Sequence, residues 1–236
     1  MQYNENEFIQ IQNSLMKKIV CEDKFDLNAV KTVAGVDLAY WNDNNDQEYA
    51  VCCIVIIDKT THKLIETKSY SDKIEVPYMP GFLAFRELPL VIKTAELLEN
   101  KPDLYMFDGN GYLHPRHMGI ATHASFYLNA PTIGVAKTYF RVEKGLDYIE
   151  PDISAGSYTD IEWNGEVYGR ALRTHNGIKP VFVSVGNNIS LDTAVKITLD
   201  MVNEESRIPI PTRLADLETH KMRAVLSGNH SDAFQT

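Results

Sequence analysis

The chain is poor in cysteine, has no long apolar run and carries no excess of positive charge. Its three cysteines cannot all pair with one another, and Cys52 and Cys53 are adjacent, so we expect reduced thiols. No apolar stretch approaches the roughly 20 residues needed to cross a bilayer, and the acidic N-terminus lacks a signal-peptide pattern. These absences predict a cytoplasmic protein that does not bind membranes.

The net charge of −9 argues against a nucleic-acid ligand, because proteins that bind nucleic acids usually carry a basic surface. The distribution of the charge along the chain weakens that objection. Residues 145–169 contain six acidic side chains and no Lys or Arg, so most of the excess negative charge lies in one stretch. Basic side chains instead accompany the motifs described below, at Arg86, His114, Arg116, His117, Lys137, Arg141 and Arg213. Their positive charge would attract a phosphodiester, although solvated surface charge explains each of them equally well.

The order of predicted elements indicates the fold class. Hydrophobic periodicity predicts helices at residues 4–20, 88–98, 118–128 and 191–202, and a last helix capped by Thr212. Strands are predicted at residues 32–39, 49–58, 62–74, 104–107, 132–136, 166–173 and 181–185. Successive strands followed by alternating helices and strands predict an α/β fold with a mixed sheet flanked by helices. We expect residues 1–236 to form a single domain, because no repeat or linker divides them.

Three carboxylates stand alone in apolar surroundings. Asp37 interrupts an apolar run at residues 32–39, and Asp108 follows another at residues 104–107. Glu87 lies two residues before Pro89, which predicts that a helix begins or is kinked there. If the fold brings the three together, they repel one another unless a divalent cation compensates their charge. The sequence therefore predicts a site for a hard cation.

Each carboxylate also has a simpler interpretation. Asp37 could form a buried salt bridge, because charged residues are seldom buried unless they are paired. Asp108 before a glycine could be a turn residue, and Glu87 could be a solvated charge near a helix end. The conjunction of all three favours the metal site.

Motifs that carry a family resemblance follow one another along the chain. They are AGVD at 34–37, PYMPG at 77–81, FRE at 85–87, DGNG at 108–111, HPR at 114–116, GIATH at 119–123, IGVAK at 133–137 and PTRLAD at 211–216. Over about residues 33–216 the chain resembles the endonuclease V family of deoxyinosine-specific endonucleases, which leaves 217–236 as a C-terminal helix and tail. The family usually has His in place of Asn110, and Gly-His-Arg in place of Gly186-Asn187-Asn188. Both departures leave the carboxylates intact and affect the contacts around them.

The resemblance implies a ribonuclease-H-like fold and a catalytic metal site. Asp37, Glu87 and Asp108 match the family's metal ligands, and Asp216 matches a fourth position that completes the site. Magnesium suits such an all-oxygen set of ligands, with Mn²⁺ as a substitute. Lys137 matches a catalytic lysine of the family that holds a phosphate. Without the resemblance, the simpler interpretation is a solvated lysine at the end of a strand.

The resemblance also implies how the substrate is selected. Tyr78 would act as a wedge that separates strands, on a loop that includes Pro77, Met79 and Pro80. Hypoxanthine would enter a pocket lined by Gly81, Leu83, Gly109, His114, Gly119 and Ile120. Without the resemblance, Tyr78 could equally be a packed loop aromatic and the glycines could mark turns.

The function implied is a magnesium-dependent DNA repair endonuclease that hydrolyses the second phosphodiester bond 3′ to deoxyinosine. The partner is then inosine-containing DNA, with RNA left open, and we expect no obligatory protein partner. One alternative is a generic ribonuclease-H-like nuclease without preference for inosine. Another is a non-catalytic module that binds nucleic acid.

Overall fold

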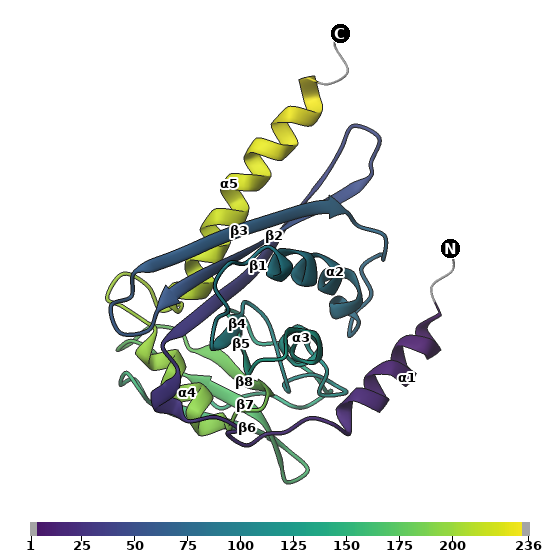
Figure 1. The fold of residues 1–236 in the computed structure, drawn as a ribbon. Coiled ribbons are helices and arrows are strands. Elements are labelled where there is room, and N and C mark those ends of the chain that lie inside the picture. Colours follow the sequence, from purple (N-terminus) through teal and green to yellow (C-terminus); the bar gives the residue numbers. More distant parts are fainter. Residues whose placement is uncertain (1–3, 233–236) are drawn as a thin grey trace.

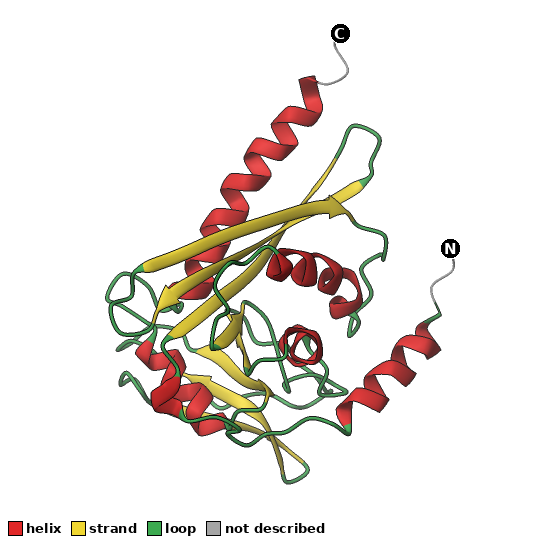
Figure 2. Cartoon of the chain, viewed as in Figure 1, coloured by secondary structure: helices red, strands yellow, loops and turns green. Residues whose placement is uncertain are grey.

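The computed structural model describes residues 4–232, in which eight strands form one sheet (Figures 1 and 2). The strands are β1 (Thr32–Asn42), β2 (Glu48–Asp58), β3 (Leu64–Lys73), β4 (Leu104–Phe107), β5 (Thr132–Ala136), β6 (Tyr158–Trp163), β7 (Glu166–Leu172) and β8 (Val181–Asn187). Their order across the sheet is β3-β2-β1-β4-β5-β8-β7-β6. β4 is parallel to β1 and β5, and every other neighbouring pair is antiparallel. The predicted mixed sheet is therefore confirmed.

Within residues 4–232, five α-helices and one short 3-10 helix accompany the sheet. They are α1 (Glu5–Met16), η1 (Leu27–Ala29), α2 (Leu83–Glu96), α3 (Ile120–Leu128), α4 (Leu191–Asp200) and α5 (Ile210–Asp232). The side chains of α2 and α3 pack on one face of the sheet, and those of α4 and α5 pack on the other. Figure 1 shows α1 at the edge of the molecule, apart from the sheet. Among the described residues, no helix combines the length and apolar character that a membrane span requires.

Strand β2 explains why the core has two sides. Ile54 and Ile56 pack with α2 and α3, whereas Val55 and Ile57 pack in the opposite core. Because successive side chains of a strand point to opposite faces, a strand covered on both faces reads as a continuous apolar run. Such a run was the signal that identified the central strands in the sequence.

Two predicted helix starts were wrong. Helix α2 begins at Leu83 rather than at residue 88, so Pro89 lies inside the helix. The apolar contacts of Ala84 and Leu88 with the sheet compensate for the backbone hydrogen bond that a proline cannot donate. Helix α5 begins at Ile210, and Thr212 lies in its first turn, where the hydroxyl donates to the carbonyl of Pro209 (3.2 Å). Thr212 is therefore not the cap that we predicted.

Strand β6 was not predicted, because its residues are largely polar and it lies at the edge of the sheet. A two-residue turn at Asn164 and Gly165, both with positive φ (53° and 81°), joins it to β7. Asn-Gly is the strongest short sequence signal for such a hairpin. The acidic stretch at residues 145–169 thus contains a strand, and only Ile161 of that strand is buried.

Candidate active site

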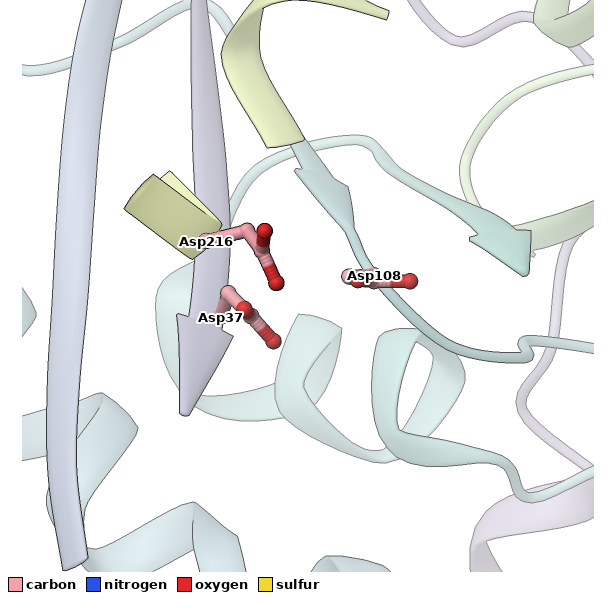
Figure 3. A group of neighbouring side chains, drawn as sticks. All are labelled: Asp37, Asp108 and Asp216. Atoms are coloured by element: carbon pink, nitrogen blue, oxygen red, sulfur yellow. The ribbon is translucent and has the colours of Figure 1, made fainter. Parts of the chain in front are cut away.

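Three of the predicted carboxylates meet where β1, β4 and α5 adjoin (Figure 3). One ligand atom from each of Asp37, Asp108 and Asp216 lies within 4.8 Å of the others. We call these three residues the carboxylate cluster. The parallel pairing of β1 and β4 extends to Asp108, whose backbone N–H donates to the carbonyl of Val36 (3.0 Å) and so places Asp108 beside Asp37.

A glycine on β1 allows α5 to bring the third carboxylate. A Cβ atom at Gly35 would lie 2.0 Å from the backbone carbon and oxygen of Pro211. No side chain larger than hydrogen fits there, so the N-terminal end of α5 can touch the strand directly. Asp216 lies five residues beyond Pro211, more than one turn further along α5, and reaches the cluster from there.

Lys137 follows β5 and forms ion pairs with two members of the cluster. Its Nζ lies 2.6 Å from Oδ2 of Asp108 and 2.9 Å from Oδ1 of Asp216. Burial opposes the charge of Lys137, but the bonds with Asp108 and Asp216 outweigh it and raise the pKa of the lysine. The predicted phosphate-binding lysine is thus also the counter-ion of the carboxylates.

One lysine does not compensate the cluster fully. Burial, followed by repulsion from Asp108, raises the pKa of Asp37 to about 8. Burial also raises the pKa of Asp108, although its bond with Lys137 opposes the shift. Carboxylates that resist ionisation beside one another are the environment that a divalent cation relieves. The donor set contains only oxygen, so the cluster fits a hard cation such as Mg²⁺.

Glu87 does not belong to this group of three. It is buried on α2, and the hydroxyl of Tyr40 donates to its Oε1. Burial raises the pKa of Glu87 to about 7, and Asp108 contributes to the shift through repulsion. The influence of Asp108 indicates that Glu87 lies near the cluster, and its role as a metal ligand stays a prediction.

A small cavity of about 140 Å³ lies beside the cluster. It is lined by Tyr78, Gly81, Leu83, Ala84, Gly109, Asn110, His114, Met118, Gly119, Ile120 and Phe140. We call it the glycine-lined cavity. It includes all six residues predicted for the base pocket together with Tyr78, whereas Pro77, Met79 and Pro80 are not among its lining residues. Asp108 and Gly109 are consecutive, so the end of β4 serves both sites.

Sequence reasoning missed four of the residues that line this cavity. Ala84, Asn110 and Met118 each adjoin a predicted pocket residue in the chain, and that adjacency was the available signal. Phe140 comes from the segment after β5 and has no comparable signal. A larger groove of about 630 Å³ between β3 and α2 includes no member of the carboxylate cluster, so size alone does not identify the site.

His114 forms part of the cavity wall as a neutral ring. Its Nδ1 accepts hydrogen bonds from the backbone N–H groups of Arg116 (3.1 Å) and Met118 (3.2 Å). Its Nε2 therefore carries the proton and donates to the carbonyl of Gly81 (3.1 Å). Burial, followed by the charge of Arg116, lowers the pKa of His114 to about 3.

The basic residues predicted to face a phosphodiester have partners within the protein. Arg86 pairs with Glu48, and the guanidinium of Arg116 donates to Gln12 and to the carbonyl of Gly81. Further ion pairs join Arg141 to Asp147 (2.5 Å) and Arg213 to Glu205 (2.6 Å). These arginines therefore offer less free charge than the sequence suggested.

Comparison with known proteins identifies the family. The family model described as Endonuclease V matches residues 13–217. Endonuclease V of Bacillus subtilis (strain 168) is 53% identical over 226 residues, which cover 96% of this chain and 94% of that protein. Endonuclease V of Clostridium acetobutylicum is 57% identical over 224 residues, which cover 95% of each chain.

Solved structures agree with this result. The crystal structure of endonuclease V from Bacillus subtilis matches with a TM-score of 0.93 at 52% identity and covers 97% of this chain and 96% of that one. Endonuclease V of Ciona intestinalis, in complex with a 24-mer DNA containing an inosine followed by a ribo-adenosine, has a TM-score of 0.82 at 29% identity, covering 94% and 98%. The predicted endonuclease family is confirmed. This chain belongs to the endonuclease V family.

Proposed function

We propose that this protein is a magnesium-dependent DNA repair endonuclease that recognises deoxyinosine and hydrolyses the second phosphodiester bond 3′ to it. The observation that carries the proposal is the adjacency of the carboxylate cluster and the glycine-lined cavity at the end of β4. A lesion held in the cavity would keep a neighbouring phosphate near the cluster, so recognition and cleavage could occur in one bound state.

The cavity has the properties of a pocket for a single flipped base. Its volume of about 140 Å³ is well below the roughly 300–1,000 Å³ of ordinary ligand pockets. Helix α3 begins at Ile120 without a side-chain cap at Gly119, so a helix N-terminus with its partial positive charge adjoins the cavity. The partial positive charge at this end of the helix suits the carbonyl oxygen of hypoxanthine. Backbone groups of the protein can form hydrogen bonds with the edge of such a flipped base.

The residues at the cluster have distinct proposed roles. Asp37, Asp108 and Asp216 would hold the cation, with Glu87 acting from α2. When bound, a divalent cation supplies charge compensation at the scissile phosphate and at the departing oxygen. Lys137 adds an ammonium charge beside Asp108 that can stabilise the charge developing on the phosphate.

The loop before α2 would separate the strands. Tyr78 has 63% of its surface exposed, although it also lines the cavity. An exposed ring on a proline-containing loop can fill the gap that a flipped base leaves in the stack. The Ciona intestinalis relative was solved in complex with inosine-containing DNA, which supports the same substrate here.

Matched DNA and RNA strands, each with one inosine or none, test this function in the presence and absence of Mg²⁺. We expect cleavage of inosine-containing DNA only with Mg²⁺, one phosphodiester beyond the nucleotide 3′ to inosine. Equal cleavage of the unmodified strand would identify a generic nuclease. Binding without cleavage would identify a non-catalytic module, and faster cleavage of the RNA strand would make RNA the preferred substrate.

A further inference from the structure

The N-terminal helix α1 has a single buried residue, and that residue is polar. Gln12 is 0% exposed, whereas the remaining residues of α1 are partly or fully exposed. Burying an amide is unfavourable unless its groups form hydrogen bonds. A helix that served only for packing would carry an apolar side chain at this position.

Both ends of the Gln12 amide bind the region next to the glycine-lined cavity. Its Nε2 donates to the carbonyl of Gly81 (3.0 Å), and its Oε1 accepts from Nε of Arg116. The same carbonyl also accepts from Nη2 of Arg116 (3.0 Å) and Nε2 of His114 (3.1 Å). Three donors therefore hold one backbone oxygen, and 69 residues separate Gln12 from it.

Gly81 is a position where the backbone needs such support. Its φ of 80° lies in the left-handed region, directly after the loop of Tyr78 and before α2. Because three donors fix its carbonyl, the orientation of this peptide also sets the direction in which the Tyr78 loop leaves the cavity.

Two further contacts attach the N-terminal segment on either side of Gln12. The ring of Phe8 stacks on Phe85 of α2, with ring centroids 3.9 Å apart and planes 7° apart. After the helix, the backbone N–H of Val20 donates to Oδ1 of Asn187 (2.8 Å). Asn187 is one of the positions where this chain departs from the usual family residue, and here it holds the N-terminal segment. The family match begins at residue 13, so Gln12 and Phe8 precede it.

We propose that α1 is a positioning element for lesion recognition and that Gln12 is its positioning residue. By holding the carbonyl of Gly81, Gln12 keeps the cavity and the Tyr78 loop in the geometry that accepts the base. Gln12 is neither a lining residue of the cavity nor a member of the carboxylate cluster. The proposal rests on the proposed function, because it assigns Gln12 to inosine selection.

Gln12→Leu tests the proposal, since leucine fills similar space and forms no hydrogen bond. We expect KM for the inosine strand to rise about tenfold, which is the effect of losing about 1.4 kcal/mol, with kcat nearly unchanged. The preference for inosine over the unmodified strand should fall by the same factor. Gln10→Leu is the matched control, because Gln10 is exposed on the same helix and should leave both values unchanged.

Two further variants separate positioning from folding. Gln12→Glu keeps the acceptor for Arg116 but puts a carboxylate oxygen in place of the donor to Gly81, so it should lose the inosine preference as Gln12→Leu does. Phe8→Ala removes the stacked ring and should lower the preference in the same direction. Melting curves of all variants show whether the fold persists at the assay temperature.

The outcomes distinguish this proposal from the proposed function. If the unaltered protein prefers inosine and Gln12→Leu keeps the same preference, the positioning role is wrong and the proposed function stands. If Gln12→Leu lowers kcat with no change in KM or preference, Gln12 serves the chemistry or the fold instead. An unaltered protein that cuts both strands equally would overturn both proposals.

Discussion

The carboxylate cluster and the glycine-lined cavity adjoin at the end of β4, yet the protein builds them in opposite ways. In the cluster, buried charges repel one another, and the pKa of Asp37 is raised to about 8. In the cavity, His114 is held neutral and both of its ring nitrogens bind backbone groups. The cluster therefore has negative charge that a cation could compensate, whereas protein hydrogen bonds already shape the cavity wall.

The first prediction separates the two regions most strongly. Asp37→Ala or Asp108→Ala should abolish cleavage, because each removes a ligand from a site with few ligands. Binding of an inosine strand without metal should survive, since the cavity is held by hydrogen bonds that do not involve Asp37 or the side chain of Asp108. Cleavage assays and gel shifts measure the two effects. Asp216→Ala should be milder, and near-normal turnover by Asp37→Ala would contradict the assignment.

Lys137→Ala tests whether the lysine serves the substrate as well as the carboxylates. Loss of one stabilising donor in an active site lowers the rate by about 10²–10³-fold, and we expect a loss of this size. The slope of log K against log salt should also fall by about one unit if Lys137 contacts a phosphate. Lys101→Ala is the control, because Lys101 is exposed at the opposite end of β4. An unchanged slope would show that Lys137 acts only as a counter-ion.

Tyr78→Ala tests whether the residues at the glycine-lined cavity serve recognition of the substrate. Stacking of a base on an aromatic ring contributes roughly 1–3 kcal/mol, so affinity for inosine duplexes should fall by about one to two decades. Cleavage at saturating substrate should change less, because the ring does not belong to the cluster. The exposed Tyr127, which lines the separate large groove, provides the control variant Tyr127→Ala. Equal loss of affinity for inosine and unmodified duplexes would remove Tyr78 from recognition.

The smallest expected effect is a difference in pH dependence. Since the pKa of Asp37 is raised to about 8, the cation-free protein carries a proton there at pH 7. Binding of Mg²⁺ should release that proton, so its affinity should rise with pH by up to about tenfold per unit and level off above pH 8. Calorimetry in two buffers of different ionisation enthalpy measures the proton released.

Binding to the cavity should not follow the same pH dependence. The pKa of His114 is lowered to about 3, so the ring is neutral from pH 5 upwards. Metal-free affinity for the nucleoside inosine, which carries no phosphate to face the carboxylates, should therefore be constant between pH 5.5 and 8. A change centred near pH 6.5 would mean that His114 titrates normally and that its proposed hydrogen bonds are not maintained.

Local sequence pattern predicted most of the sheet and helices. The buried runs at β1, β2 and β5 are apolar on both faces, so they were recognisable without neighbours. Strand β6 and the starts of α2 and α5 were missed, because a polar edge strand and an internal proline depend on what packs against them.

The residues of the site also divide into those that the sequence pattern identified and those that depended on the tertiary structure. Asp37 and Asp108 were identifiable from the sequence because isolated carboxylates in apolar runs require compensation. The sequence offered Asp216 only through the family resemblance, and the tertiary structure shows how the contact of α5 with Gly35 brings it to the other two, while Glu87 lies outside the group with Tyr40. The tertiary structure also decided that Lys137 pairs with carboxylates and that Gln12 holds Gly81. Periodicity reports which side chains are buried, whereas contacts between distant residues depend on strand order and helix docking.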